Sequence, residues 1–236
     1  MDSYWESQDD LVRIKVIGIG GGGSFVSAPR EEWDRTFAVT WGGVYNCARA
    51  FVPLLIAADE GHLVNTSSVN GFWASLGPGI PHTAYSTAKF AVKGFSEALL
   101  EDLRLNAPHV AVSVVMPGHI GTDIMLNSRA ILAAGRSEAE QATAVRATLG
   151  ERGLVTDDMD DAAVIGVLDS FGEMFRDMAP MSAADAATVI LDGVRAGEWR
   201  ILVGDDARHL DERVRTDPGS VYGPDGVSLV GLLPDR

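Results

Sequence analysis

Cysteine and positive charge are both scarce in this chain, and each shortage excludes a class of structure or partner. The 236 residues include a single cysteine, Cys47, so no disulfide can form within the chain. Lys and Arg number 19 against 33 Asp and Glu, which gives a formal net charge of −14 and an isoelectric point near 4.6. This excess of negative charge argues against nucleic acids and anionic membranes as partners.

Signals of membrane insertion, export and metal binding are also missing from the sequence. No apolar run approaches the length of a membrane span, and the first residues, MDSYWESQDD, lack the basic and apolar regions of a signal peptide. The five histidines do not have metal-ligand spacing, nor does the acidic cluster at 157–161 have the spacing of a metal loop. Hydrophobic residues make up 46% of the chain, enough for one substantial core. We therefore expect a cytoplasmic protein that binds no metal.

The most informative pattern lies between residues 61 and 123. Gly61–Ser68 and Pro108–Gly118 each have the pattern of a short buried strand, and the first ends in small polar residues. Between them a helix is predicted, with Thr83 as its candidate N-cap. The residues that repeat at helical spacing are Ala88, Val92, Phe95, Leu99 and Leu103. Two strands joined by a helix form the βαβ pattern of a parallel sheet.

Tyr85 and Lys89 lie one helical turn apart, so they should share one face of this helix. A phenol ionises near pH 10, and an ammonium group in contact lowers that pKa by roughly 1–3 units, which would make the tyrosine a usable acid or base. Such a pair is common by chance, and an interfacial tyrosine beside a solvated lysine is the simpler explanation when it stands alone. Here Ser68 and the loop Pro117–Thr122 should meet it beyond the carboxyl ends of the strands, where ligands bind.

These features, in this order, resemble the short-chain dehydrogenase/reductase family. The resemblance covers about Gly18–Asp123 well and extends more loosely to about Arg215. It implies an α/β fold with a Rossmann-like doubly wound parallel sheet. It also implies an NAD(P)-dependent oxidoreductase, which passes a hydride between nicotinamide and a secondary alcohol or ketone. Relatives dimerise through the helices that match Val44–Ala57 and Tyr85–Leu105, so a homodimer is expected.

The resemblance implies a role for each matching residue. Tyr85 matches the catalytic acid/base, and Lys89 matches the lysine that lowers the pKa of the tyrosine and binds the nicotinamide ribose. Ser68, rather than the adjacent Ser67, matches the serine that holds the substrate oxygen. Thr40 stands where the family usually keeps a catalytic asparagine, which holds a water of the proton relay. Threonine lacks the second donor and the reach of that amide, so lower activity is expected.

The implied cofactor is NAD or NADP. Its nicotinamide end would be held by Tyr85 and Lys89 and by the loop after the second strand. The loop residues that match the family are Pro117, Gly118, Ile120 and Thr122. Gly18 matches the glycine of the family's Asn-Asn-Ala-Gly motif, although both asparagines are absent here.

The front of the chain departs from the family. A complete member begins with a strand, a glycine-rich turn and a helix, which bind the pyrophosphate, and nothing before Tyr85 supplies this unit. Gly18–Gly23 satisfies G-x-G-x-x-G, but the helix and acidic residue that this fingerprint requires do not follow at the right places. A flexible glycine loop is the simpler explanation, and a phosphate-binding loop is the alternative. We therefore expect cofactor binding to be weak.

Two other functions compete with this interpretation. A truncated, non-catalytic fragment or pseudoenzyme without effective cofactor binding is suggested by the unmatched leader 1–17, by the lost asparagines and by Thr40. A serine hydrolase that uses Ser68 is disfavoured, because the sequence has no G-x-S-x-G motif and offers Ser68 no evident histidine partner.

The expected organisation has three parts. Residues 1–17 form an atypical leader with a first strand, residues 18–215 form the catalytic portion, and residues 216–236 form a poorly ordered tail. Within the second part, 125–180 is a helical region that covers the substrate. The sheet is reduced to about four parallel strands, which are Leu11–Ile17, His62–Thr66, Val110–Val115 and Arg200–Val203. Met125, Leu126, Met174, Phe175 and Met178 either line an apolar pocket or belong to the core.

Overall fold

A parallel sheet of three strands lies at the centre of the computed structural model, which describes residues 24–78, 80–150 and 154–228. The strands are β1 (Gly61–Thr66), β2 (Val110–Pro117) and β5 (Arg200–Val203), in the order β1–β2–β5. Three of the four predicted strands are therefore confirmed, as is the α/β class. The fourth predicted strand, Leu11–Ile17, lies outside the described residues.

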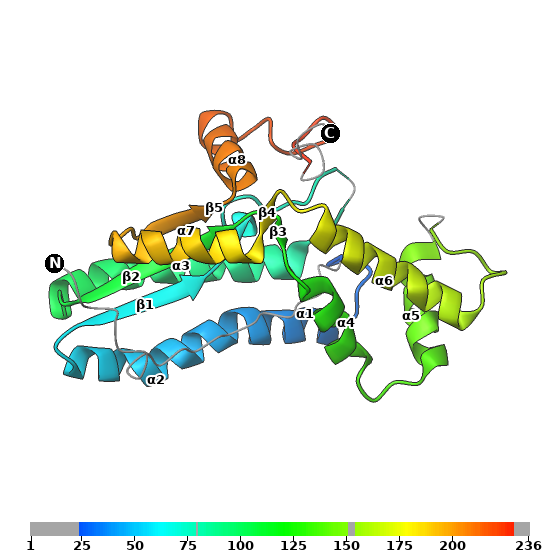
Figure 1. The fold of residues 1–236 in the computed structure, drawn as a ribbon, viewed down its shortest axis with the longest axis horizontal. Helices are drawn as coiled ribbons and strands as arrows, with labels where there is room; N and C mark the ends of the chain where they lie inside the picture. Colours follow the sequence, from blue (N-terminus) through cyan, green and yellow to red (C-terminus); the bar gives the residue numbers. More distant parts are fainter. Residues whose placement is uncertain (1–23, 79, 151–153, 229–236) are drawn as a thin grey trace.

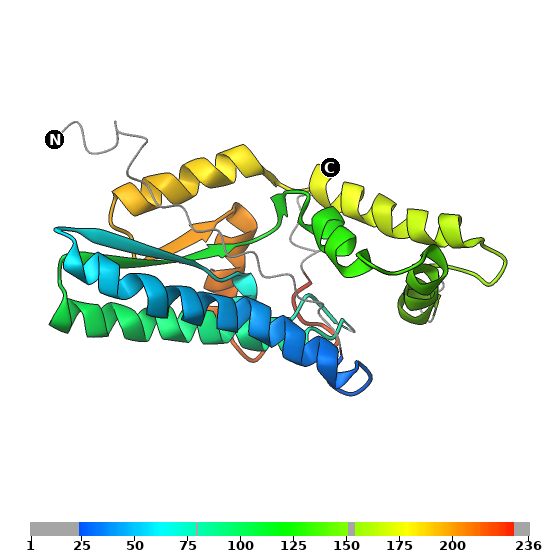
Figure 2. The ribbon, with the colours of Figure 1, turned by 90° about the horizontal axis from the view of Figure 1, so that it is seen from below.

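Helices cover both faces of this sheet, as the doubly wound fold requires (Figures 1 and 2). One face is packed against α2 (Gly43–Ala57) and α3 (Thr83–Asn106), and the other against α7 (Ala183–Arg195). The first interface buries Leu103, Val110 and Val112, and the second buries Val115, Ala186, Ile201 and Val203. Strands buried on both faces need apolar side chains on both, which explains the nearly continuous apolar run of β2.

Helix α3 carries the residues of most interest. Its predicted apolar stripe is confirmed, because Ala88, Val92 and Leu103 are all buried. The predicted N-cap was wrong by one residue, since Thr83 is the first residue of the helix and His82 occupies the cap position. Helix ends are the positions that sequence patterns define least well.

A π-helical turn, Ala38–Gly42, joins α1 (Arg30–Phe37) to α2 without a break in the helical backbone. Such turns are rare and often occur at functional sites. This one contains Thr40, whose side chain is buried. The segment that resembles the family's asparagine-bearing helix is thus helical, and it includes a local change of helical pitch at the residue of interest.

Three helices form a lobe beside the sheet (Figure 1). They are α4 (Ile124–Ala133), α5 (Glu138–Leu149) and α6 (Asp161–Asp177). Buried Ala142 and Val145 of α5 and Val164 of α6 form a small core between these two helices, and α4 packs on α6. Two short parallel strands, β3 (Ile120–Gly121) and β4 (Met181–Ser182), pair at the base of the lobe. The described residues of 125–180 are therefore mostly helical, as expected, and their role in covering the substrate stays a prediction.

The C-terminal part begins with α8 (Asp205–Thr216) and continues as an irregular segment to residue 228. In this segment Val221 and Val227 are buried against Trp73, whose Nε1 donates a hydrogen bond of 3.2 Å to the Val221 carbonyl. The part of the tail at 217–228 thus packs on the protein, although poor order was expected there, and 229–236 lie outside the described residues. No helix of the described residues is both long and apolar enough to cross a membrane.

Candidate active site

Ser68, Tyr85 and Lys89 meet beyond the carboxyl end of β1. The Ser68 and Tyr85 hydroxyl groups are hydrogen-bonded to each other. The Lys89 ammonium lies over the face of the Tyr85 ring, 5.4 Å from its centroid, and donates a hydrogen bond of 3.0 Å to the Thr66 carbonyl. Three of the four predicted catalytic residues are therefore brought together by the end of β1 and the first turns of α3.

The two adjacent serines have different surroundings. Ser67 continues the ladder between β1 and β2, because its amide donates to the Val115 carbonyl at 2.8 Å. Its buried hydroxyl donates to the Lys89 carbonyl at 2.9 Å and so attaches α3 to the sheet. The Ser68 hydroxyl accepts a hydrogen bond from the Asn70 amide at 3.2 Å and reaches Tyr85. The hydrogen bonds of Ser67 thus hold the fold together, whereas the Ser68 hydroxyl is bonded to Tyr85.

Burial dominates the electrostatics of this cluster. Burial raises the pKa of Tyr85 above its ordinary value, and the hydrogen bond from Ser68 opposes that rise. Burial also lowers the pKa of Lys89 to about 8. The lowered pKa that the sequence predicted for Tyr85 is therefore not found. The physical reason is that burial removes the water that would stabilise the charged phenolate. The same burial disfavours the charged form of Lys89, which was expected to stabilise the phenolate.

Thr40 is buried in the π-helical turn Ala38–Gly42, which packs against α3, the helix that carries Tyr85 and Lys89. Its Oγ1 is buried and has no hydrogen-bond partner among the residues that the structure describes. Leaving a buried hydroxyl unsatisfied costs about 1–3 kcal/mol, and ordered water is the usual remedy. A water held at Thr40 would match the role that the family gives to the asparagine at this position.

The loop after β2 lies at the same edge of the sheet. Pro117 ends β2, the Gly118 amide donates to the Val203 carbonyl at 2.9 Å, and Ile120 begins β3. Thr122 follows β3 and is half-buried. Because β1 and β2 are adjacent and parallel, this loop and Ser68 emerge side by side. The loop residues predicted to contact the nicotinamide thus lie at the same sheet edge as Ser68, whereas Gly18 and the loop Gly18–Gly23 lie outside the described residues.

Two residues of this edge were not singled out from the sequence. The His119 amide donates a hydrogen bond of 2.6 Å to the Asp206 carboxylate, and both residues are buried. The His119 ring also packs on Phe175 and donates through Nε2 to the Phe175 carbonyl at 2.6 Å. One signal was available in the sequence: Asp206 comes just after the last predicted strand, so it had to lie at the same edge as Ser68.

The five apolar residues predicted as pocket or core divide into two groups. Leu126 packs against Gly172, and Phe175 packs against His119, so both contribute to packing within the protein. Met125, Met174 and Met178 are 48%, 46% and 42% exposed. None of the five residues lines the pocket described below.

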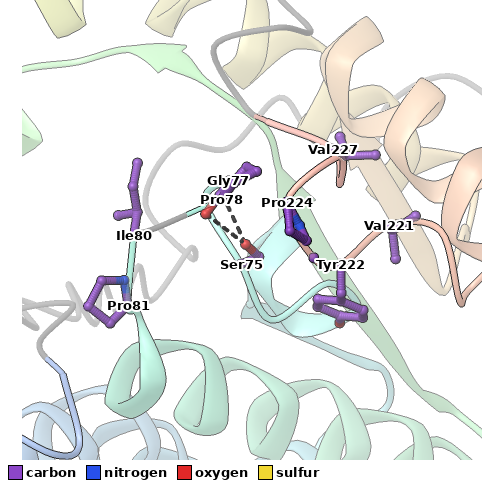
Figure 3. A pocket seen from close by; sticks show the side chains of 10 residues that line it. Ser75, Gly77, Pro78, Ile80, Pro81, Val221, Tyr222, Pro224 and Val227 are labelled. Atoms are coloured by element: carbon purple, nitrogen blue, oxygen red, sulfur yellow. Dashed lines mark hydrogen bonds between the residues drawn. The ribbon is translucent and has the colours of Figure 1, made fainter.

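A pocket of about 860 Å³ lies instead between the loop before α3 and the C-terminal segment (Figure 3). Ile80 and Pro81 lie on one side of it, and Tyr222 and Pro224 on the other. Its remaining lining residues are Ser75, Gly77, Pro78, Val221, Gly223 and Val227. The loop side leads directly into the turn of α3 that carries Tyr85.

Among the described residues, no group of three or more His, Cys, Asp or Glu side chains could hold a metal ion. The groups gathered at this sheet edge are the Ser68 and Tyr85 hydroxyl groups, the buried Lys89, backbone groups of the loop after β2, and the buried Asp206 carboxylate bonded to that loop. This set can hydrogen-bond a small polar substrate and exchange a proton with it.

Comparison with known protein sequences gives a consistent result. A family model described as short chain dehydrogenase matches residues 9–132. The SadH protein of Mycobacterium tuberculosis is 32% identical over 206 residues, which cover 87% of this chain and 61% of SadH. A 3-ketodihydrosphingosine reductase of Bacteroides thetaiotaomicron is 34% identical over 128 residues, or 54% of this chain and 45% of the reductase. The chain thus spans about three-fifths of the length of SadH.

Solved structures resemble the fold. A short-chain dehydrogenase/reductase of Burkholderia phymatum, crystallised with NAD, aligns with a TM-score of 0.63 at 24% identity, covering 90% of this chain and 68% of that one. A short-chain dehydrogenase of Burkholderia cenocepacia, crystallised with NADP, aligns with a TM-score of 0.58 at 17% identity, covering 93% of this chain and 67% of that one. These likenesses confirm the Rossmann-like arrangement of the described elements.

Proposed function

The chain belongs to the short-chain dehydrogenase/reductase family, and from this premise we propose that it is an NAD(P)-dependent oxidoreductase acting on a secondary alcohol or ketone. The observation that carries the proposal is the contact of Ser68, Tyr85 and Lys89 beyond the carboxyl end of β1. Because the chain spans 61% of SadH, the activity, substrate and partners of the whole protein are all parts of the proposal.

Tyr85 would exchange the proton. A bound nicotinamide cofactor would supply or accept the hydride at the carbon of the substrate. The Ser68 hydroxyl would hydrogen-bond the substrate oxygen and hold it within reach of the Tyr85 hydroxyl, to which Ser68 is already bonded. Because burial raises the pKa of Tyr85, its phenol is protonated at neutral pH and acts as a general acid. This supports ketone reduction as the favoured direction near neutral pH, with alcohol oxidation gaining at alkaline pH.

Lys89 and Thr40 would complete the proton path. An ammonium has three N–H donors, and the described residues provide Nζ with one acceptor, the Thr66 carbonyl. The other donors suit ribose hydroxyls and a relay water. Thr40, with its unsatisfied buried Oγ1, would hold that water. The residues present therefore fit the nicotinamide end of the cofactor.

The loop after β2 would hold the nicotinamide through Pro117, Gly118, Ile120 and Thr122. We further propose that the helices of residues 125–180 cover the substrate. Their exposed methionines support an apolar contact surface, because methionine adapts to irregular ligand shapes. NAD or NADP is the proposed cofactor. The weak binding and the cytoplasmic location expected from the sequence stay predictions.

A homodimer through α2 and α3 is part of the proposal. Exposed apolar side chains on these helices support it, since Leu54, Phe90 and Leu105 are 63%, 41% and 82% exposed. Sedimentation of the wild type at micromolar concentration tests this directly, and a monomer would contradict it.

A second candidate is a family member without effective catalysis or cofactor binding. Thr40 favours it, because a threonine cannot offer the two donors of an amide at this position. In that case Tyr85 and Lys89 would keep their arrangement without carrying out catalysis.

The experiment that separates the two candidates is a turnover screen with NADH and NADPH on a panel of ketones, and with the oxidised cofactors on alcohols. Wild type, Tyr85→Phe and the control Tyr45→Phe are compared, because Tyr45 lies exposed on α2. The first candidate predicts activity in the wild type and the control only. Activity that survives in Tyr85→Phe would refute the assigned mechanism.

A further inference from the structure

Asp206 is a buried carboxylate at the catalytic edge that the proposed mechanism does not use. It is the second residue of α8 and only 6% exposed. Its Oδ2 accepts the hydrogen bond of 2.6 Å from the His119 amide, 87 positions earlier in the chain. Its Oδ1 is buried and has no hydrogen-bond partner within the described part of the chain. A buried carboxylate with so few partners is costly, so a structural role alone explains it poorly.

Two glycines make room for this carboxylate. A Cβ built on Gly118 or on Gly204 would overlap the Asp206 carboxylate oxygens. Gly204 also has a φ of +104°, a backbone conformation that other residues rarely adopt. The end of β2, the end of β5 and the start of α8 thus all approach closely around one carboxylate group.

His119 links this contact to the lobe. Its backbone is held by Asp206, while its ring donates to the Phe175 carbonyl of α6 and packs on the Phe175 ring at 4.2 Å between centroids. The loop between β2 and β3 is therefore held from two sides, by α8 and by α6. Of the two contacts, the one to Asp206 is the hydrogen bond that a charge strengthens.

We infer that Asp206 is a positioning residue, whose carboxylate fixes the backbone of the loop Pro117–Thr122 in the shape that receives the nicotinamide. The inference rests on the proposed function for the role of the loop, but the contact itself can be tested without it. If Asp206 is removed, the His119 amide loses its hydrogen-bond acceptor, and Gly118 loses the carboxylate that packs closely against it. Cofactor binding then weakens, whereas the proton chemistry at Tyr85 stays intact in the molecules that do bind.

The competing explanation is that Asp206 only stabilises the N-terminus of α8, as acidic residues in a first turn generally do. The sequence provides a matched control for this, because Asp205 is in the same turn of the same helix and is exposed. A helix-end effect would be shared by both residues, whereas the loop contact belongs to Asp206 alone.

The first arm of the experiment measures amide hydrogen exchange at His119 in the protein without cofactor. Wild type is compared with Asp206→Ala, Asp206→Asn and Asp205→Asn. We expect the His119 amide to exchange at least tenfold faster in Asp206→Ala and at the wild-type rate in Asp205→Asn. Asp206→Asn keeps an acceptor oxygen and should restore part of the protection. Unchanged exchange in both Asp206 variants would overturn the inference, whatever the protein catalyses.

The second arm measures steady-state kinetics with the cofactor varied. In Asp206→Ala we expect the KM for the cofactor to rise about tenfold, with kcat within twofold of wild type and an unchanged KM for the substrate. Asp206→Asn should lie between, which keeps the arm informative if the alanine variant does not fold. A lower kcat at an unchanged cofactor KM would overturn the positioning role. If the wild type shows no turnover while the first arm succeeds, the proposed function fails and the cofactor part of the inference fails with it, but the contact between loop and carboxylate is confirmed.

Discussion

Replacing Lys89 by methionine is expected to stabilise the folded protein while abolishing turnover. Lys89 is 6% exposed, and burial lowers its pKa from the ordinary value of 10.5 to about 8. The unfolded chain keeps the lysine proton up to about pH 10.5, whereas the folded protein releases it near pH 8. Between these values the unfolded state binds more protons, so the free energy of unfolding rises with pH. Below about pH 8 Lys89 is protonated in both states, so the folded protein bears the full free-energy cost of burying the charged lysine.

The size of this penalty follows from the two pKa values. One pKa unit is worth about 1.36 kcal/mol, so the fall from 10.5 to about 8 corresponds to roughly 3 kcal/mol at neutral pH. Methionine has a similar length and carries no charge. It gives up the hydrogen bond from Nζ to the Thr66 carbonyl, which offsets about 1 kcal/mol. Lys89→Met should therefore raise the free energy of unfolding by about 2 kcal/mol at pH 7.

Urea unfolding at pH 7 and at pH 10 tests this reasoning, with wild type and variant measured in parallel. The gain from Lys89→Met should shrink by about 2 kcal/mol between the two pH values, because the wild type loses most of its penalty by pH 10. Lys93→Met is the matched control, because Lys93 lies one turn further along α3, is only partly buried and is paired with Glu97. A gain that does not change with pH, or a loss of stability at pH 7, would refute the argument. Stability gained at the cost of activity is common for residues at active sites.

Three further predictions follow from particular residues. Thr40→Asn should raise kcat about tenfold or more by supplying the second donor for the relay water, while Thr40→Val should lower kcat. Steady-state kinetics tests this, and a lower kcat in Thr40→Asn would count against the relay. Trp73→Ala should lower the free energy of unfolding by about 3–5 kcal/mol in urea and release the segment around Val221. Trp199→Ala, at an exposed tryptophan, should lower it by well under 1 kcal/mol, and equal losses of stability would contradict the packing described. Calorimetric titration should give millimolar affinity for NADH and NADPH, and tight binding that depends on Lys89 would contradict the expected weakness.

Local patterns predicted much of the fold and the centre of the site. The strands β1, β2 and β5 and the helix α3 each have a clear pattern of apolar residues within one continuous segment. This periodicity and the order of the segments were enough to predict them. The same holds for Tyr85 and Lys89, which are neighbours on one helix. Ser68 could be placed with them, because the end of a parallel strand and the start of the next helix share a sheet edge.

What the sequence did not predict depends on residues far apart in the chain or on burial. The contact between His119 and Asp206 joins positions 87 apart, and the bond from Trp73 to Val221 joins positions 148 apart. No local pattern records either pairing. The pKa of Tyr85 was predicted to fall because a lysine lies one turn away, but its direction is set by how much water the folded protein excludes.

The central claim is that Tyr85 passes the proton while the nicotinamide passes the hydride. Incubating the protein with a ketone and a reduced cofactor carrying deuterium on the transferable position, followed by mass spectrometry of the alcohol, tests it most directly. We expect deuterium on the carbinol carbon with wild type and with Tyr45→Phe, and a rate of transfer at least 100-fold lower with Tyr85→Phe. No transfer by the wild type, or transfer that survives in Tyr85→Phe, would contradict it.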